Sequence, residues 1–273
     1  MYLMGDSIDD IYYDLAQNIM NNGEIVVARG AETKELRNVT ITIKDPSKLL
    51  LLNAKRNISL KYAFGELFWY LSGSDELNFI SHYAKSYGKY SDDGVRLNGA
   101  YGPRIIEQIE KIQELLTHDP NSRRAVISIY HDLELSLNSK DIPCTLNLQF
   151  LIRDNKLHLI TTMRSNDLYL GFPYDLFSFG MIQRWLALKL NTELGTYTHF
   201  IGSVHIYKKH YDFFKSLDNT ITENKLQNIN IGNILNNIPL ALEVERLTRT
   251  GKVHDNYLNN LDKDFRMLSK ILK

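Results

Sequence analysis

The sequence predicts a single α+β domain that spans residues 1–273. Three observations favour this fold class. The chain has 273 residues, of which 44% are hydrophobic, so it is long enough to bury a sizeable core. Strand-like and helix-like segments both occur, in an order without internal repeats. No Gly/Ser-rich linker or clear domain boundary interrupts them.

Apolar periodicity and capping residues predict the helices. Asp6 or Ser7 can cap the first helix, and Gly23 lies just beyond its expected end. Pro103 opens an amphipathic helix, and the segment 59–72 is apolar nearly all round, which is typical of a buried helix. The predicted helices cover residues 7–21, 59–72, 75–85, 103–116, 176–190, 207–217 and roughly the last 15 residues.

Short apolar and β-branched runs predict the strands. Asp154-Asn155 has turn composition and joins two of these strands in a hairpin. The polar, Asn-rich stretch from 218 to about 237 indicates an exposed connection. The predicted strands are 24–28, 39–43, 125–130, 146–153, 157–163, 195–207 and 238–247.

Composition and charge exclude several classes of protein. The formal net charge is zero, which argues against a general nucleic-acid binder. No stretch approaches the ~18 consecutive apolar residues of a membrane span, and no signal peptide is evident. The single cysteine excludes an intrachain disulfide and suits a reducing compartment. We therefore expect a cytoplasmic protein with no membrane partner.

Several side chains could carry chemistry, and each also has a structural interpretation. Cys144 follows Pro143 at the mouth of a strand, where its thiol can face a cleft, although a lone cysteine is more often a small buried hydrophobe. Glu66 lies inside an apolar helix, so its carboxylate must be paired, hydrogen-bonded or neutral. His205 and Tyr207 are two residues apart on a strand and point to one face.

Motifs that include these residues follow one another in a fixed order. The main segments are Pro143-Cys144, then Arg164-Ser-Asn-Asp167 with Pro173-Tyr-Asp175, then His205-Ile-Tyr207. The accompanying matches are Glu66 in its aromatic helix, Tyr101 in Asn-Gly-Ala-Tyr-Gly, and Ser122-Arg123-Arg124 after Asp-Pro-Asn. Together they resemble the thymidylate synthase family, which includes the dCMP and CMP hydroxymethylases. The resemblance covers roughly residues 10–215 and implies a mixed sheet, flanked by helices, that dimerises through the sheet; the part from about residue 218 diverges.

The resemblance implies covalent catalysis by Cys144. A thiolate that adds to C6 of a pyrimidine nucleoside monophosphate makes C5 a carbon nucleophile, which can attack a one-carbon unit. The nearby Arg164 would favour the thiolate. Glu66, as general acid or base, and Tyr101 belong to the same implied catalytic group. The implied co-substrate is 5,10-methylenetetrahydrofolate, and no metal is implied.

The resemblance also assigns ligand-binding residues. His205 and Tyr207 would hold the 3′-hydroxyl of the sugar, and Asp167 would bind the folate pterin. The implied phosphate ligands are Arg29, Arg123, Arg124, Arg164 and Ser165. The other implied ligand positions are Asn166 and Asp175 for the substrate and Tyr87, Tyr90 and Gly171 for the folate. In the family the arginine pair comes from the partner subunit, which implies an obligate homodimer with shared active sites; an isolated pair would otherwise be a solvated surface pair.

Three residues depart from the thymidylate synthase pattern and favour a cytosine substrate. Asp175 stands where thymidylate synthases carry Asn. A carboxylate accepts hydrogen bonds from the N4 amine and the protonated N3 of cytosine, whereas an amide matches uracil. Thr145 and Ser203, in place of the usual His and Asp, are similar to dCMP hydroxymethylase. We therefore expect 5-hydroxymethylation of a cytidylate, dCMP in preference to CMP.

Two alternatives stay open on the sequence. One is a thymidylate synthase that converts dUMP to dTMP, in which hydride rather than water completes the reaction. The other is a catalytically idle relative that binds nucleotide or RNA as a regulator. The C-terminal tail that closes the folate site in thymidylate synthases is not recognisable in this sequence.

Overall fold

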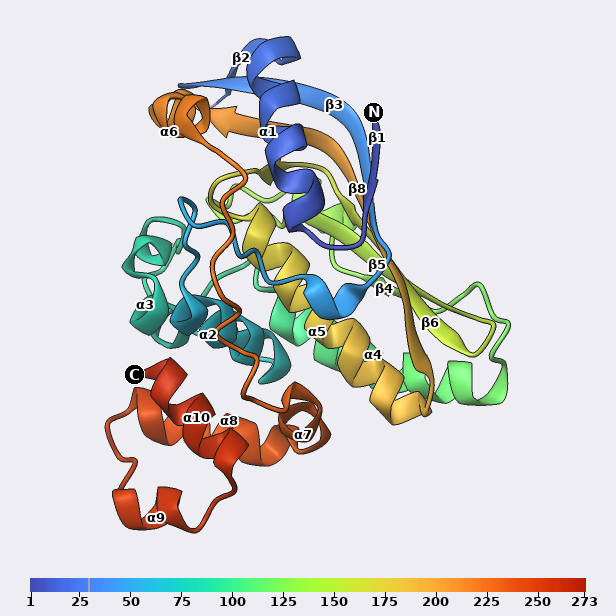
Figure 1. The fold of residues 1–273 in the computed structure, drawn as a ribbon, viewed down its shortest axis with the longest axis vertical. Coiled ribbons are helices and arrows are strands. Elements are labelled where there is room, and N and C mark those ends of the chain that lie inside the picture. The colour runs from blue at the N-terminus through green and yellow to red at the C-terminus, as the bar shows by residue number, and fades with distance from the viewer. Residues whose placement is uncertain (29) are drawn as a thin grey trace.

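The strands of the computed structural model, which describes residues 1–28 and 30–273, form one mixed sheet (Figure 1). They are β1 (Tyr2–Gly5), β2 (Glu24–Ala28), β3 (Ala31–Ile43), β4 (Val126–Ser128), β5 (Thr145–Arg153), β6 (Lys156–Met163), β7 (Asn166–Asp167) and β8 (Glu193–Tyr207). Their order is β1-β3-β8-β6-β5-β4, with β2 added on β3 and β7 on β8. β6 and β7 run parallel to β8, whereas β3 runs antiparallel to it. The predicted mixed α+β architecture is confirmed.

Helices pack along the sheet and against one another. They are α1 (Asp9–Asn22), α2 (Leu60–Leu71), α3 (Leu77–Tyr83), α4 (Tyr101–His118), α5 (Phe172–Leu190), α6 (Tyr211–Ser216), α7 (Ile231–Asn236), α8 (Ile238–Arg249), α9 (Asp255–Asn259) and α10 (Lys263–Leu272). α5 lies against β6 and β8, α1 against β3, and α4 against β4. Figure 1 shows α2 and the C-terminal helices farther from the strands than α5.

Alternation along the central strands separates two faces of the sheet. On β8, Tyr197, His199 and Ile201 are buried, whereas Thr198 and Phe200 between them are half-buried. The buried face meets α5, whose side chains are apolar on nearly every side. The core therefore lies between one face of the sheet and the helices.

The β5–β6 hairpin turns where the sequence predicts it. Asp154 and Asn155 both have positive φ, 51° and 58°, as a two-residue turn of the hairpin type requires. Asn and Asp tolerate this left-handed backbone better than other residues with a side chain. The turn fixes the register of β5 and β6, and so pairs Thr145 with Met163 next to the functional motifs.

Other boundaries differ from the predictions. The predicted strand 238–247 is wrong, because these residues form α8: Asn237 caps it, Pro239 lies in its first turn, and its buried residues recur at helical spacing. The connection 218–237 is not wholly exposed, since α7 buries Ile231, Ile234 and Leu235. β1 was not predicted, and β3 begins at Ala31 rather than at residue 39.

Two further corrections affect the site. α5 begins at Phe172, so Asp175 lies in its first turn and not in the preceding loop; Pro173, near the helix start, explains the early beginning. Tyr207 is the last residue of β8, and the helix expected over 207–217 is limited to α6 after a short 3₁₀ turn.

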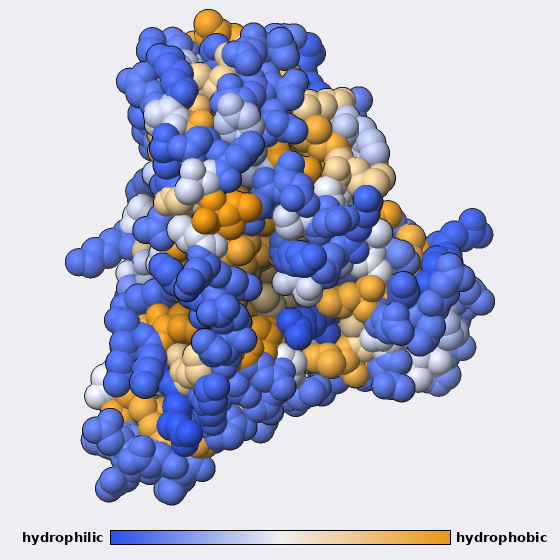
Figure 2. Space-filling model, viewed as in Figure 1, coloured by the Kyte–Doolittle hydropathy of each residue, from blue (hydrophilic) through white to orange (hydrophobic). Residues whose placement is uncertain are grey.

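The surface seen in Figure 2 is largely hydrophilic, with hydrophobic residues in scattered patches and around a hollow near its centre. Among the described residues, no helix is long and apolar enough to cross a membrane.

Candidate active site

Cys144 is half-buried just before β5, and Arg164 holds the segment that leads to it. The Cys144 carbonyl accepts the backbone N–H of Arg164 at 2.9 Å. The Arg164 guanidinium donates from Nε to the carbonyl of Pro143 at 2.8 Å and from Nη2 to that of Ile142 at 2.9 Å. Since β5 and β6 are paired, the residue after β6 lies beside the residue before β5. The structure thus brings together the predicted nucleophile and its predicted arginine.

Tyr101, the first residue of α4, reaches the same place. Its hydroxyl oxygen accepts the backbone N–H of Thr145 at 3.3 Å. Burial raises the pKa of Tyr101 well above its ordinary value, and the neighbouring Cys144 and Asp175 raise it further. The phenol therefore keeps its proton, and it can donate a hydrogen bond beside both side chains.

Glu66 lies in α2 among tyrosines. Its Oε1 accepts hydrogen bonds from the hydroxyls of Tyr62 at 2.6 Å and Tyr87 at 3.1 Å. Within the described part of the chain, its buried Oε2 has no hydrogen-bond partner. Burial raises the pKa of Glu66 to about 6, against the lowering effect of the tyrosine hydrogen bonds. A carboxyl that titrates there can take up or release a proton near neutral pH.

Asp175 and Asn166 form a buried pair. Asn166 Nδ2 donates to Asp175 Oδ2 at 2.7 Å. Burial, and then the nearby Glu66 carboxylate, raise the pKa of Asp175 well above its ordinary value. The site therefore favours the protonated form of Asp175 until a partner for the carboxylate arrives.

A histidine that the motifs do not include continues this pair inward. His199 Nε2 lies 3.2 Å from Asn166 Oδ1, and His199 Nδ1 lies 2.8 Å from the hydroxyl of Tyr197. Burial lowers the pKa of His199 to about 3, so the ring is neutral. His199 and Tyr197 come from β8, and Asn166 comes from β7, which pairs with β8.

Asp167 and Gly171 shape the loop between β7 and α5. Asp167 Oδ1 accepts the backbone N–H groups of Tyr169 at 2.8 Å and Leu170 at 3.1 Å. Its Oδ2 is buried without a hydrogen-bond partner among the described residues. A Cβ at Gly171 would lie 3.0 Å from Asp175 Oδ2, so Gly171 allows the buried pair to sit against the backbone.

His205 and Tyr207 share a face of β8, as the sequence predicts. Their rings meet edge to face with centroids 5.1 Å apart. Burial lowers the pKa of His205, although Asp167 and Glu35 oppose this shift. Ser203, on the same strand, donates to Glu35 Oε2 at 2.6 Å. A neutral imidazole beside a phenol offers both a donor and an acceptor to a hydroxyl group.

The predicted phosphate ligands fall in two places. Ser165 is half-buried and directly follows Arg164, whose backbone N–H binds the Cys144 carbonyl. Arg123 and Arg124 are exposed just before β4, the last strand in the sheet order. In the part of the chain that the structure describes, no hydrogen bond or ion pair links the side chain of Arg123 or Arg124 to Cys144, Arg164 or Tyr101. Arg29 lies outside the described residues.

The two predicted folate tyrosines have different surroundings. Tyr87 packs edge-on against Trp69 with ring centroids 5.7 Å apart, and its hydroxyl contacts that of Tyr62 at 3.0 Å. Tyr90 packs on Tyr87, and the Lys89 amine lies 4.7 Å above its ring. Tyr87 is therefore tied to Glu66, whereas Tyr90 faces a cation.

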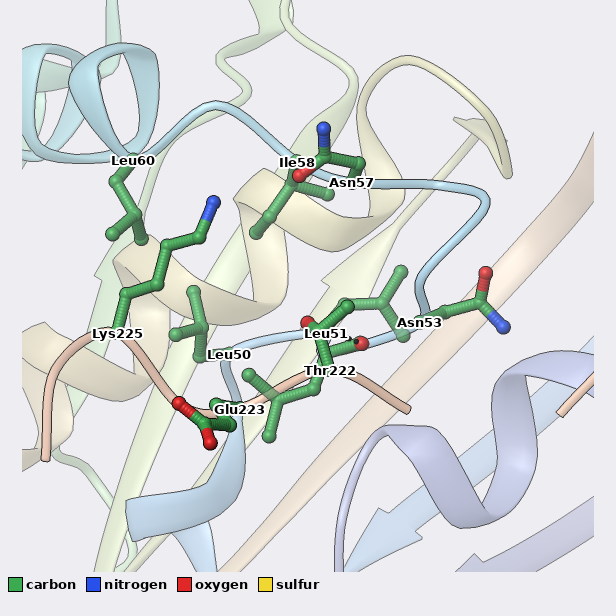
Figure 3. A pocket seen from close by; sticks show the side chains of 10 residues that line it. Leu50, Leu51, Asn53, Asn57, Ile58, Leu60, Thr222, Glu223 and Lys225 are labelled. Carbon is green, nitrogen blue, oxygen red and sulfur yellow. Dashed lines mark hydrogen bonds between the residues drawn. The ribbon is translucent and has the colours of Figure 1, made fainter. Parts of the chain in front are cut away.

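The described part of the structure has two cavities that lie away from the predicted site residues. One, of about 20 Å³, lies between the segment 50–60 and residues 222–225, with Leu50, Ile58 and Lys225 among its lining side chains (Figure 3). It has room for about one water. The other, of about 380 Å³, is lined by Asp75, Asp92, Asp93, Arg96, Leu97, Asn98, Ala100, Pro103 and Arg104. Neither is lined by the predicted site residues. Over the described ranges, no group of three or more His, Cys, Asp or Glu residues could hold a metal ion.

Two neighbours of the predicted site residues, Tyr62 and His199, are not among the sequence predictions. Tyr62 precedes Glu66 by one helical turn, and this i, i+4 spacing could have indicated the contact. His199 gives no such local signal, since its partner Asn166 is 33 residues away in the chain.

Comparison with known proteins relates the chain to one family. A model of the thymidylate synthase family matches residues 10–240. A deoxyuridylate hydroxymethyltransferase of Bacillus phage SP01 is 33% identical over an alignment of 225 residues, and the match covers 76% of this chain but only 59% of the phage protein. A putative thymidylate synthase of Methanocaldococcus jannaschii is 31% identical over an alignment of 215 residues that covers 77% of this chain and 92% of that protein. A thymidylate synthase of Vesicomyosocius okutanii subsp. Calyptogena okutanii is 29% identical over an alignment of 178 residues that covers 61% of this chain and 67% of that protein.

Proposed function

Because the chain belongs to the thymidylate synthase family, we propose that it transfers a one-carbon unit to C5 of a pyrimidine nucleotide. The nucleotide we propose is a cytidylate, dCMP before CMP, and the product is its 5-hydroxymethyl derivative. The buried Asp175, held by Asn166, is the observation that carries the choice of base.

Cys144 is the proposed nucleophile. Its thiolate adds to C6 of the ring, the electron pair of the C5–C6 double bond moves onto C5 and the conjugated C4 position, and C5 then uses this pair to form a bond to the one-carbon unit. Arg164 supports this step by fixing the two carbonyls before Cys144, and the positive charge that it brings to this segment would favour the thiolate. Loss of the C5 proton and cleavage of the bond between the one-carbon unit and the folate nitrogen would release tetrahydrofolate and leave an exocyclic methylene on C5. Water adds to this methylene as hydroxide, and departure of the Cys144 thiolate from C6 then restores the aromatic ring.

Asp175 recognises the base by hydrogen bonding in this proposal. Its Oδ2 is occupied by Asn166, so Oδ1 is the oxygen left for a ligand. Ionised, Asp175 accepts hydrogen bonds from cytosine, whose N3 gains a proton as the ring accepts the thiolate. A raised pKa suits this exchange, because it makes Asp175 a carboxyl that can hold a proton and pass it to N3.

Glu66 is the proposed general acid or base. Two phenols hold Oε1, which leaves the buried Oε2 as the working oxygen. Water that adds to the one-carbon unit needs a base, and a carboxyl with a pKa of about 6 is suited to that role.

The proposed co-substrate, 5,10-methylenetetrahydrofolate, would supply the one-carbon unit at the oxidation level of formaldehyde. Asp167 fits its pterin, since a buried carboxylate oxygen without a partner can accept hydrogen bonds from the pterin N–H groups. Tyr90 offers an aromatic face near Glu66 through its contact with Tyr87.

A uracil nucleotide is the second candidate substrate. The phage relative is named a deoxyuridylate hydroxymethyltransferase. A protonated Asp175 can donate to O4 of uracil, and burial favours this form in the empty site. The other two relatives are named a thymidylate synthase and a putative thymidylate synthase, and reductive methylation of dUMP to dTMP is the alternative final step.

The test is to incubate the purified protein with dCMP, CMP or dUMP and the folate, and to identify the products by mass spectrometry. We expect 5-hydroxymethyl-dCMP without dihydrofolate, since only the reductive route oxidises the folate. Conversion of dUMP to dTMP alone would refute the proposal. Hydroxymethylation of dUMP alone would refute the cytosine substrate and support a uracil nucleotide in its place. Cys144→Ser should abolish turnover and keep nucleotide binding, whereas an idle regulator would be unaffected.

We also propose a homodimer that forms through the half-buried face of the sheet. Leu151, Ile160 and Phe200 leave apolar surface on this face. Arg123 and Arg124 lie at the β4 edge of the sheet, where a second copy could use them for its nucleotide phosphate. A reducing cytoplasm is the proposed location, since the single cysteine must stay a thiol to act.

A further inference from the structure

His199 lies at the inner end of a buried chain of hydrogen bonds that leads to Asp175. We propose that His199 is a positioning residue for base selection: its ring fixes the orientation of the Asn166 amide, and the amide decides which oxygen of Asp175 is presented to the base. The inference rests on the proposed function in one respect, namely that Asp175 contacts the base.

This chain of hydrogen bonds is continuous, and its inner end is closed to solvent. From Asp175 Oδ2 it runs to Asn166 Nδ2 at 2.7 Å, from Asn166 Oδ1 to His199 Nε2 at 3.2 Å, and from His199 Nδ1 to the Tyr197 hydroxyl at 2.8 Å. The exposed fractions of Asp175 and Asn166 are 8% and 3%, and those of His199 and Tyr197 are 0%. Water therefore cannot replace a lost partner at the inner end without opening the core.

The orientation of the Asn166 amide gives this chain of hydrogen bonds one direction. The neutral His199 ring has one N–H and one acceptor nitrogen. The Tyr197 hydroxyl can donate to Nδ1, which leaves the proton on Nε2, and Nε2–H then donates to Asn166 Oδ1. With its oxygen so engaged, Asn166 turns its N–H₂ group toward Asp175.

The direction of these hydrogen bonds determines which oxygen of Asp175 can carry its proton. An amide donor on Oδ2 leaves any titrating proton on Oδ1, and no hydrogen bond involves Oδ1 among the described residues. Oδ1 can then accept from cytosine when Asp175 is ionised, or donate to uracil when it is protonated. If Asn166 flipped, its oxygen would face Oδ2, the carboxyl proton would be held between these two oxygens, and Oδ1 would be an acceptor in every state.

His199 has no other evident role at the site. It is fully buried, and its ring meets Phe172 edge to face with centroids 5.8 Å apart. Burial lowers its pKa to about 3, so it neither carries charge nor exchanges protons near neutral pH. It acts through Asn166, one residue removed from Asp175.

The test compares kcat/KM for dCMP and dUMP in wild type, His199→Phe and His199→Gln. Phenylalanine keeps the ring contact and removes both nitrogens, so Asn166 can flip, and the ratio of the preferred to the other nucleotide should fall by roughly 10-fold or more. Glutamine returns a side-chain N–H and should recover most of the ratio. His158→Phe is the matched control, since His158 lies on β6 and pairs with Thr196, and it should leave the ratio unchanged.

Tyr197→Phe keeps the inference testable if His199→Phe does not fold. It removes only the O–H next to Nδ1 and should lower the ratio by about 3-fold or more, because the imidazole proton is then free to move to Nδ1. An unchanged ratio in the folded variants would overturn the inference while the proposed function stands. A wild type that turns over neither nucleotide would overturn both.

Discussion

At the scale of single residues, Asp175 is the side chain that we propose selects the base. Its carboxyl lies in the first turn of α5, with one oxygen bound by Asn166. Asp175→Asn replaces the acceptor by an amide that offers one donor and one acceptor, as uracil requires. We expect kcat/KM to shift toward dUMP relative to dCMP by roughly 10- to 100-fold, about 1–3 kcal/mol. Steady-state kinetics with both nucleotides measure the ratio, and equal discrimination by wild type and variant would exclude base selection by Asp175.

Glu66 links the site to pH-dependent stability. Its pKa is raised from 4.5 to about 6 in the folded protein. As pH rises, the unfolded chain therefore releases this proton at a lower pH than the folded protein does. Stability from this group is complete below about pH 4.5 and is lost as pH rises through about 6. Glu66→Gln, which cannot ionise, should be more stable than wild type at pH 8 by about 2 kcal/mol and equal to it at pH 4. Denaturant unfolding at both pH values checks this, and a constant difference between the proteins would contradict it.

The sequence predicts which site residues lie together where local sequence or the order of the motifs determines their neighbours. Cys144 and Arg164 meet because they flank the two strands of the hairpin that the sequence predicts, and Tyr101 contacts Thr145, the residue after Cys144. His199 could not be predicted, since a histidine in a strand shows neither its partner nor its protonation state. Its contact with Asn166 depends on the pairing of β7 with β8, which a two-residue strand does not reveal in sequence.

At the scale of elements, α8 is held by a buried ion pair. Glu245, which is 1% exposed, accepts from Arg249 Nε at 2.6 Å and from the hydroxyl of Tyr83 in α3 at 2.7 Å. The Arg249 guanidinium also lies 4.1 Å from the centroid of the Phe79 ring. Truncation of one partner leaves a buried charge and a phenol without their acceptor.

Glu245→Ala should therefore reduce the free energy of unfolding by about 3 kcal/mol. Glu243→Ala on the same helix is the control, because Glu243 and Arg246 are partly exposed and their pair contributes less than about 1 kcal/mol. We propose that residues 1–273 form one cooperative unit, so the loss should appear in a single unfolding transition. A separate early transition for the C-terminal helices would refute the single-domain prediction.

The elements that sequence patterns predicted best have strong local signals. The hairpin at Asp154-Asn155 and the aromatic helix α2 lie where expected. α8 was mistaken for a strand because Ile238 to Leu247 is a short mixed run, in which periods of two and 3.6 are hard to separate. The Asn237 cap and Pro239 were the better guides.

At the scale of the whole molecule, the proposed homodimer can be tested by mixing two variants, because a site shared between subunits can be restored only in a mixed dimer. If Arg124 serves the site of its partner, Cys144→Ser and Arg124→Ala should each be inactive alone, yet complement each other when mixed. Random exchange of subunits makes half of the dimers mixed, and each mixed dimer has one intact site. We therefore expect about a quarter of wild-type activity. Refolding the two variants together and assaying turnover tests this, with each variant refolded alone as the control; no recovery would place Arg124 outside the shared site.

The parallel pairing of β6 with β8 has a consequence for how the protein folds. Parallel neighbours cannot be joined by a tight turn, so the chain from Arg164 through α5 must cross over before β8 can pair with β6. That crossover carries Arg164, Asn166, Asp167 and Asp175. Long-range pairing of this kind is slow, because the cost of closing the loop comes before the contacts that repay it. During refolding, the hairpin amides of β5 and β6 should gain protection from hydrogen exchange before those of β8, and nucleotide binding should return only with β8.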